Sequence, residues 1–412
     1  MRAGLRAPRR TAAALALVLV SAACAVPAAA QSASTPSPSP SPSPSPSSTI
    51  SSAEAAATAP NDLEATAASL VADMTVAEQA SSVVMGHIGG TDPAAVQAYM
   101  QAGFGGFILM GTNIPATEPE LQALTAAMTV DPALPPLVAV DQEGGLVSRL
   151  HGDDFPASTT LKERPVEDTA AAFTARGALV ARAGITVDFG TVADVTADRG
   201  SFIYGRALGA DPASAAERTA AATIAQEQFL ASTLKHFPGH GAAPGDSHRG
   251  IPSTALSLDE WRAGDAVPFA TGIEAGASLL MFGHLAYTAV DPLPASLSPT
   301  WHAIARDELG FDGVAVTDDL GMLLSSGDPA FADPVANAVA ALAAGSDLLL
   351  MVAGSDAQTA GAMAAGIATA VESGTVPAAR LQEAATRVLA LRLELAASTA
   401  RWSVCGDCTP AG

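Results

Sequence analysis

The amino-acid sequence of 412 residues predicts an α/β protein with one large domain, a (β/α)8 barrel of the TIM type. Short apolar runs rich in β-branched residues alternate with alanine-rich stretches, as buried parallel strands alternate with helices. There are eight such runs, which is the strand number of this barrel. They cover residues 82–85, 106–110, 137–141, 185–189, 231–235, 278–283, 313–318 and 347–352. An open, doubly wound sheet has the same alternation and is the alternative.

Residues 1–30 have the pattern of a signal peptide, with arginines first, then the apolar run 12–20, then small residues. The run is too short to span a bilayer, which takes about 20 apolar residues. Two processing sites compete. Cleavage after residues 28–30 would give a secreted protein, whereas residues 21–24 resemble a lipobox that would leave a lipid anchor on Cys24. Either site predicts an extracellular or cell-surface protein.

Residues 31–60 are dominated by serine, proline and alanine, a composition typical of a disordered tether. The barrel domain is then expected over 61–400, followed by a C-terminal tail, 401–412, that contains Cys405 and Cys408. We expect these two cysteines to form a small disulfide in an exported protein, because no strand precedes them and no further zinc ligand is near in the sequence. A tether directly behind the lipobox cysteine favours the lipid-anchored alternative.

The formal net charge of −21 argues against a nucleic-acid partner, since binding nucleic acid requires a basic surface. Acidity of this kind is typical of a soluble exported protein and does not identify a substrate. We expect a monomer that needs no cofactor.

Several of the predicted helices have clear start signals. A capping box consists of an N-cap hydroxyl followed three residues later by a glutamate, and an N-cap followed by proline at the first helical position is a second signal. The capping boxes are Thr75 with Glu78 and Ser257 with Glu260, and the proline signals are Asp211-Pro212 and Ser298-Pro299.

Charged residues collect at the carboxyl ends of the predicted strands. Asp141 ends the third run, Lys235 and His236 end the fifth, His284 follows the sixth, and Asp318 ends the seventh. Because the carboxyl ends of barrel strands form one mouth where active sites lie, these side chains should converge there. A buried lysine at such a place needs an anionic partner.

Asp318 and Asp319 follow an apolar strand directly, so one of them can reach the mouth of the barrel. A carboxylate there can act as a nucleophile on an electrophilic carbon. We assign that position to Asp318 and expect Asp319 to cap the next helix.

The glycine-rich segment 235–248 holds three of the seven histidines. Asp246 stands two residues before His248, a spacing at which a carboxylate can orient an imidazole and raise its basicity. His236 and His240 have the H-x-x-x-H spacing of some zinc sites, but Pro238-Gly239 between them prevents the helix that would align the two rings. We therefore expect proton transfer and polar contacts at this segment, and no metal site.

These residues match a known family. From Met74 to about Leu393 the chain resembles the single-domain bacterial β-N-acetylglucosaminidases, or β-N-acetylhexosaminidases, of glycoside hydrolase family 3. The Lys235–His248 loop with its Asp-Ser-His is specific for this branch. The other shared motifs are Gly105-Gly106-Phe107-Ile108-Leu109 with Asn113, Val140-Asp141-Gln142-Glu143-Gly144-Gly145, Gly205-Arg206-Ala207-Leu208-Gly209, Pro294-Ala295-Ser296-Leu297-Ser298 and Gly310-Phe311-Asp312-Gly313.

The resemblance implies a retaining mechanism with a covalent glycosyl-enzyme. Asp318 would be the nucleophile, His248 the acid and base, and Asp246 the partner of His248. The residues that would hold the sugar are Asp141, Arg149, Arg206, Lys235 and His236. The implied substrates carry terminal N-acetylglucosamine, as peptidoglycan fragments and chitooligosaccharides do.

Two other functions stay open at this stage. A phosphorylase would use phosphate in place of water, because an imidazole does not repel an anionic acceptor. A sugar-binding lipoprotein would have kept the fold and lost turnover. The chain also departs from the family pattern, for example at Leu146 where an arginine is common, so the finer shape of the sugar pocket is not predicted.

Overall fold

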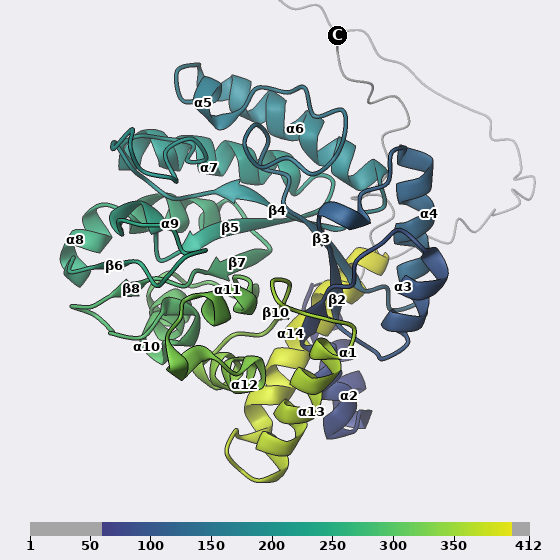
Figure 1. Ribbon diagram of the computed structural model, residues 1–412. Helices are drawn as coiled ribbons and strands as arrows, with labels where there is room; N and C mark the ends of the chain where they lie inside the picture. Colours follow the sequence, from purple (N-terminus) through teal and green to yellow (C-terminus); the bar gives the residue numbers. More distant parts are fainter. Residues whose placement is uncertain (1–59, 398–412) are drawn as a thin grey trace, which may run out of the picture. The chain divides into compact units, whose positions relative to one another are not determined.

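The computed structural model describes residues 60–397, and the predicted signal peptide, Cys24, nearly all of the predicted linker and the Cys405–Cys408 pair lie outside these residues. In the described part, eight parallel strands form one sheet in the order β10-β1-β2-β3-β4-β5-β7-β9 (Figure 1). The strands are β1 (Val84–Gly86), β2 (Gly106–Leu109), β3 (Leu137–Val140), β4 (Val187–Val192), β5 (Ala231–Phe237), β7 (Leu279–Phe282), β9 (Val314–Thr317) and β10 (Leu349–Leu350).

The two end strands of this order also meet. Val316 of β9 forms a parallel bridge with Leu348, and the amide of Thr317 donates to the carbonyl oxygen of Leu348 at 3.1 Å. The sheet is thereby joined into a ring, which confirms the (β/α)8 barrel and rules out the open doubly wound alternative. All eight predicted strands are present, with ends that differ by a few residues.

Helices surround the ring of strands (Figure 1). They are α1 (Pro60–Asp73), α2 (Val76–Ser82), α3 (Pro93–Met100), α4 (Glu118–Met128), α5 (Ser158–Leu161), α6 (Val166–Arg182), α7 (Pro212–Gln226), α8 (Leu258–Ala263), α9 (Ala266–Glu274), α10 (Pro299–Ala303), α11 (Leu320–Ser325), α12 (Pro334–Ala344), α13 (Thr359–Glu372) and α14 (Ala378–Ala397). The shorter helical turns are η1 (Gly111–Asn113), η2 (His240–Ala242), η3 (Ala295–Leu297), η4 (Ile304–Glu308) and η5 (Pro329–Phe331). Within residues 60–397, no helix is both long and apolar enough to cross a membrane.

The predicted helix starts are confirmed. Thr75, Asp211, Ser257 and Ser298 each accept a hydrogen bond from a backbone amide in the first turn of α2, α7, α8 and α10. Both predicted capping boxes are formed in full. These caps satisfy amides that a helix leaves unpaired at its start, so they fix where each barrel helix begins.

Strand side chains alternate between two buried clusters. Ile108 packs with Met85, Leu137 and Phe189, whereas its neighbours Phe107 and Leu109 pack with helix residues in a second cluster. Alternation follows from the two-residue period of a strand, and burial on both faces is the property of parallel barrel strands. This explains the continuous apolar runs in the sequence.

A small second sheet was not predicted. β6 (Ser253–Thr254) pairs in parallel with β8 (Ala286–Tyr287). Because β6 follows the histidine-rich segment, the pairing fixes the far end of that segment to the loop after β7. Strands of two residues carry too little periodicity to be found in a sequence.

The seam between β9 and β10 depends on one buried carboxylate. Asp347 is fully buried and accepts hydrogen bonds from the amide of Ala315, at 3.0 Å, and from the guanidinium groups of Arg306, Arg380 and Arg387. The carboxylate therefore ties the closing strands to η4 and α14.

We expect Asp347→Ala to lower the free energy of unfolding by about 3–5 kcal/mol, because it removes the buried anion that three partly buried arginines share, although Arg380 and Arg387 retain Glu383. Asp259→Ala is a matched control, since that carboxylate is 92% exposed and pairs only with Arg262 in the structure; its cost should stay within about 0.5 kcal/mol. Urea unfolding of both variants checks this, and equal costs would contradict the role of Asp347.

Candidate active site

The centre of the site is a buried ammonium group between two carboxylates. Lys235 is 2% exposed, and its Nζ lies 2.7 Å from Asp141 Oδ1 and 2.7 Å from Glu143 Oε1. Asp141 follows β3, and Lys235 lies near the end of β5. Burial lowers the pKa of Lys235, but the two carboxylates outweigh it and the net shift is upward. The predicted need of Lys235 for an anionic partner is confirmed.

Glu143 also holds the predicted sugar-binding Arg206. The guanidinium of Arg206 donates from Nε to Glu143 Oε2 at 2.9 Å and from Nη2 to Oε1 at 2.7 Å. Burial raises the pKa of Glu143, but Lys235 and Arg206 together lower it to about 2. This ion-paired cluster joins the ends of β3 and β5 to the loop before α7.

His236 is fixed by a second buried carboxylate. Its Nδ1 lies 2.7 Å from Asp194 Oδ2, and its Nε2 lies 3.2 Å from Arg206 Nη2. Because Arg206 can only donate, His236 Nε2 is the acceptor, so Nδ1 carries the proton and donates to Asp194. The Lys235–His236 peptide bond is cis.

Asp318 directly follows β9, and its amide donates to the carbonyl oxygen of Phe282 at 2.9 Å, so its backbone continues the ladder with β7. Burial raises the pKa of its carboxyl group, but the neighbouring imidazoles of His236 and His284, the hydrogen bond from the amide of Asp319 and the ammonium of Lys235 lower it more, so the net shift is downward. The carboxylate is therefore held ionised at the mouth, as a nucleophile requires.

Asp319 has the capping role expected from the sequence. Its carboxylate accepts from the amide of Gly321 at the start of α11, and from the amides of Val352 and Ala353 after β10. The two neighbouring acidic residues thus differ in place: Asp318 lies at the mouth of the barrel, and Asp319 caps α11 and holds the loop after β10.

His284 and Asn113 shape this end of the barrel. His284 is bonded through both ring nitrogens, to Ser296 Oγ at 2.7 Å and to the carbonyl oxygen of Asp319 at 2.8 Å. Asn113 is buried and donates to the carbonyl oxygens of Ile88 and Gly90. Neither side chain is free for proton transfer in this arrangement.

The segment from Pro238 to Pro252, here called the flap, carries the dyad of Asp246 and His248. His248 Nδ1 lies 2.7 Å from Asp246 Oδ1, and the His248 side chain is 61% exposed. Burial raises the pKa of Asp246, but the side-chain and backbone hydrogen bonds from His248 together outweigh it, so the net shift is downward. The imidazole is therefore oriented by its carboxylate with Nε2 directed away from it.

The base of the flap is packed tightly. The indole of Trp261 and the hydroxyl of Tyr287 donate to the carbonyl oxygens of Pro238 and Gly239, each at 2.8 Å. A Cβ atom on Gly241 would lie 1.7 Å from the carbonyl oxygen of Val195, so only glycine fits there. The glycines of this segment let the flap base lie against the loop after β4.

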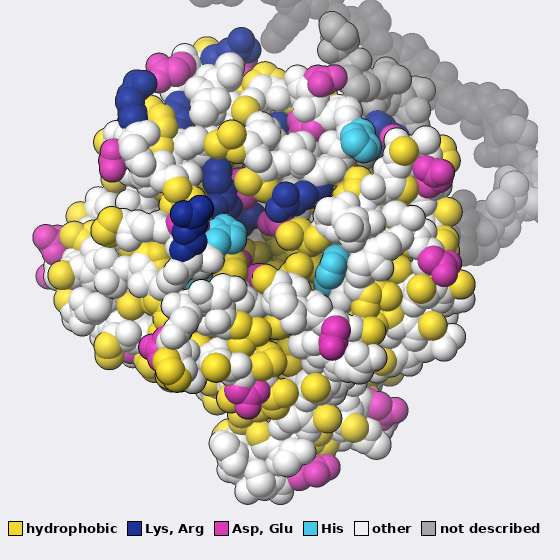
Figure 2. Space-filling model, in the orientation of Figure 1, with side chains coloured by type: hydrophobic (Ala, Val, Ile, Leu, Met, Phe, Trp, Pro, Cys, Tyr) yellow, Lys and Arg dark blue, Asp and Glu magenta, His cyan; other side chains and the backbone are white. Residues whose placement is uncertain are grey.

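Arg149 lies beside Asp141 at the rim. Its Nη2 is 3.7 Å from Asp141 Oδ2, and its side chain is 33% exposed. All of the predicted sugar-binding residues thus lie in one connected group, with Asp141 between Arg149 and Lys235. Figure 2 shows lysine, arginine and histidine side chains around a hollow at the centre of the face toward the reader.

The zinc alternative finds no support in the geometry. His236 and His240 have ring centroids 6.0 Å apart at an interplanar angle of 82°, and His236 is already bonded to Asp194. In the part of the chain between residues 60 and 397, no three histidine, cysteine or acidic side chains form a group that could hold a metal ion.

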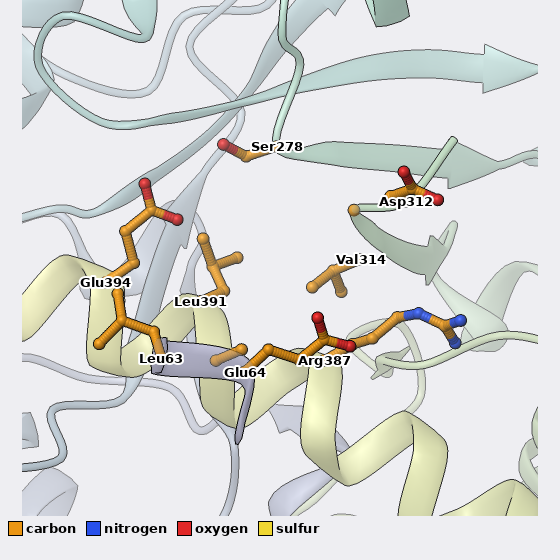
Figure 3. Close-up of a pocket in the computed structure, with 10 residues that line it drawn as sticks. Leu63, Glu64, Ser278, Asp312, Val314, Arg387, Leu391 and Glu394 are labelled. Carbon is orange, nitrogen blue, oxygen red and sulfur yellow. The ribbon is translucent and has the colours of Figure 1, made fainter. Parts of the chain in front are cut away.

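A cavity of 570 Å³ lies at the other end of the strands (Figure 3). Leu63 of α1, Arg387 and Leu391 of α14, and Ser278 and Val314 at the starts of β7 and β9 line it. Active sites of barrels lie at the carboxyl ends of the strands, so this cavity is not the candidate site.

Glu143, Asp194 and Gln142 were not assigned roles from the sequence. Glu143 and Gln142 stand inside a matched motif, and Asp194 follows β4, the fourth strand. Charge balance could have pointed to Glu143 and Asp194, because a buried lysine, arginine and histidine at one mouth require anions.

His240 is a buried histidine without a partner for its ring. It is 1% exposed, and within the described residues neither ring nitrogen has a hydrogen-bond partner. Its ring packs edge-on against Phe202 at 4.7 Å. Burial lowers the pKa of His240 from 6.5 to about 4, so the folded protein keeps this imidazole neutral.

As the pH falls, the unfolded chain therefore binds a proton at His240 before the folded protein does. This difference lowers the free energy of unfolding progressively as the pH falls from about 6.5 to about 4. We therefore compare the free energy of unfolding of His240→Phe with that of wild type at two pH values. We expect the variant-minus-wild-type difference to be about 2 kcal/mol more favourable to the variant at pH 5 than at pH 7. Urea unfolding at both pH values tests this. An unchanged difference would show that folding does not shift the pKa of His240.

Comparison with known proteins agrees with this geometry. Residues 78–391 match the family model described as the glycosyl hydrolase family 3 N terminal domain. A beta-hexosaminidase of Pseudomonas aeruginosa is 38% identical over 255 residues, which are 60% of this chain and 74% of the relative.

Two solved structures also superpose on this chain. A glycoside hydrolase family 3 beta-N-acetylglucosaminidase from Paenibacillus sp. superposes with a TM-score of 0.73 at 29% identity, over 79% of this chain and 63% of the other. A beta-N-acetylhexosaminidase from Beutenbergia cavernae superposes with a TM-score of 0.69 at 28% identity, over 78% of this chain and 98% of the other.

Proposed function

The chain belongs to glycosyl hydrolase family 3, and from this premise we propose that it is an exported, retaining β-N-acetylhexosaminidase. It is a glycoside hydrolase that acts on terminal N-acetylglucosamine, with peptidoglycan fragments or chitooligosaccharides as its substrates. The observation that carries the proposal is the combination of an ionised Asp318 at the barrel mouth with a carboxylate-oriented His248 on the flap.

The sugar is held by the buried ionic cluster. Lys235 keeps an ammonium group that two carboxylates fix in place, and Asp141 offers its remaining lone pairs to sugar hydroxyls. Arg206 and His236 are oriented by Glu143 and Asp194. Because these groups are already positioned, binding a sugar does not have to order them, which lowers the entropic cost of binding.

In the first step Asp318 attacks the anomeric carbon while the glycosidic carbon–oxygen bond breaks. The imidazolium of His248 gives its Nε2 proton to the departing oxygen, and Nδ1–H stays bonded to Asp246. The product of this step is a glycosyl ester on Asp318, and the imidazole is left neutral with Nε2 free to accept a proton.

In the second step water attacks the anomeric carbon and the ester bond to Asp318 breaks. His248 Nε2 takes the proton of the water, which restores the imidazolium, and Asp318 leaves as a carboxylate. Two displacements at one carbon return the original configuration. A histidine thus replaces the second carboxylate of the usual retaining glycosidase.

The acceptor could also be phosphate, since the exposed His248 imidazole would not repel an anion. We favour water for an exported protein, because phosphate is scarce outside the cell. Sugar 1-phosphate formed in phosphate buffer would decide for the phosphorylase, and binding without any turnover would decide for a sugar-binding lipoprotein.

Export is proposed from the pattern of residues 1–30, with either cleavage before Gln31 or a lipid on Cys24 that holds the enzyme at a membrane surface. Mass spectrometry of the mature N-terminus distinguishes the two products.

Wild-type protein should hydrolyse an aryl N-acetylglucosaminide. We expect Asp318→Ala to lose at least about 10³-fold in kcat, because the nucleophile is gone. His248→Ala should lose about 10²–10⁴-fold with a natural disaccharide, whose poor leaving group needs a proton. Steady-state kinetics, with circular dichroism to confirm folding, provide the measurement.

His151→Ala is the matched control, because His151 is an exposed loop histidine near the same mouth and should leave kcat unchanged. A folded Asp318→Ala variant with wild-type turnover would contradict the assignment of the nucleophile.

A further inference from the structure

We propose that Gln142 is a positioning residue that sets the place of Arg149 in the sugar pocket. The inference deepens the function proposed above and rests on it. Gln142 follows Asp141 directly, yet its side chain is fully buried and contacts the backbone of the loop that leads to Arg149.

The Gln142 side chain uses every hydrogen-bonding position that it has. Its Oε1 accepts from the amides of Arg149, at 2.8 Å, and Leu150, at 2.9 Å. Its Nε2 donates to Ser148 Oγ at 2.7 Å and to Asp153 Oδ2 at 2.6 Å. An amide has two acceptor and two donor positions, so the set is complete. Such saturation fixes the loop in one conformation.

This arrangement is tied to the barrel frame at two points. Asp153 pairs with Arg176 of α6, from Nε to Oδ2 at 2.7 Å and from Nη2 to Oδ1 at 3.1 Å, and both side chains are fully buried. The backbone amide of Gln142 donates to Asp188 Oδ1 of β4 at 2.9 Å. The loop backbone at Arg149 is therefore held by α6 and β4 through Gln142.

The Arg149 side chain has little else to hold it. Its ion pair to Asp141 is long, at 3.7 Å, and its Nε is buried without a hydrogen-bond partner among residues 60–397. An ion pair of this length holds a long side chain only weakly. Its working position beside Asp141 must then be set from its backbone, which is the part that Gln142 holds.

The test is Gln142→Met, which keeps the length of the side chain and removes all four hydrogen bonds. We expect KM for an aryl N-acetylglucosaminide to rise about ten-fold while kcat changes less than about two-fold, since Arg149 contributes binding common to the ground and transition states. Arg149→Ala should raise KM similarly. The double variant should be no worse than Arg149→Ala alone, because Gln142 acts through Arg149.

Gln79→Met is the matched control. Gln79 is also buried and donates to the carbonyl oxygens of Val71 and Met74, far along the chain from the site. The Gln79→Met variant should be less stable than wild type and keep the wild-type KM. Ser148→Ala, which removes only one of the bonds to Gln142, should raise KM about two- to three-fold and serves if Gln142→Met does not fold.

Additive effects of Gln142→Met and Arg149→Ala, or a wild-type KM in folded Gln142→Met or Ser148→Ala protein, would overturn the inference while the proposed function stands. A wild-type protein that neither binds nor hydrolyses N-acetylglucosaminides would instead overturn the proposed function itself.

Discussion

The site depends on the burial of one ammonium group. Lys235 is 2% exposed at the mouth of the barrel, where an unpaired charge would cost several kcal/mol. Two carboxylates make this position possible, and one of them, Glu143, is shared with Arg206. The resulting cluster connects β3, β5 and the loop before α7. Any change in one member therefore alters the surroundings of the others, so the proposed sugar-binding groups should behave as a unit.

The molecule separates a buried floor from an exposed histidine, His248, which we propose as the acid and base. The floor contains buried side chains that are hydrogen-bonded to one another, including the Gln142 arrangement behind Arg149. His248 is 61% exposed, and among residues 60–397 its side chain is bonded to its flap partner, Asp246. β6 and the contacts to Trp261 and Tyr287 hold the two ends of the flap.

Much of this architecture could be predicted from the sequence, because strong local signals carry it. Apolar runs located all eight strands, N-cap residues located the starts of several helices, and charged residues after strands located the mouth. Asp319 was correctly separated from Asp318, since a helix follows it at once. Closure of the barrel was favoured but not decided, because an open sheet produces the same alternation.

The remainder depends on contacts between distant parts of the chain. Glu143 and Asp194 become essential only when the fold brings Arg206 and His236 to them. Gln142 has an ordinary polar side chain in the sequence, and its role follows from a loop conformation that no periodicity encodes. The pairing of β6 with β8 involves two residues from each strand, which is too short for a recognisable pattern.

The central claim is that Asp318 and His248 act on one glycosidic bond. A crystal structure of an inactive variant, Asp318→Asn, with an intact N-acetylglucosaminyl disaccharide tests it most directly. We expect the residue 318 side chain at about 3–3.5 Å from the anomeric carbon and the His248 Nε2 at about 2.6–3.2 Å from the glycosidic oxygen. A disaccharide bound at the mouth with His248 facing a separate cavity, in a flap that cannot reach the bond, would contradict the account.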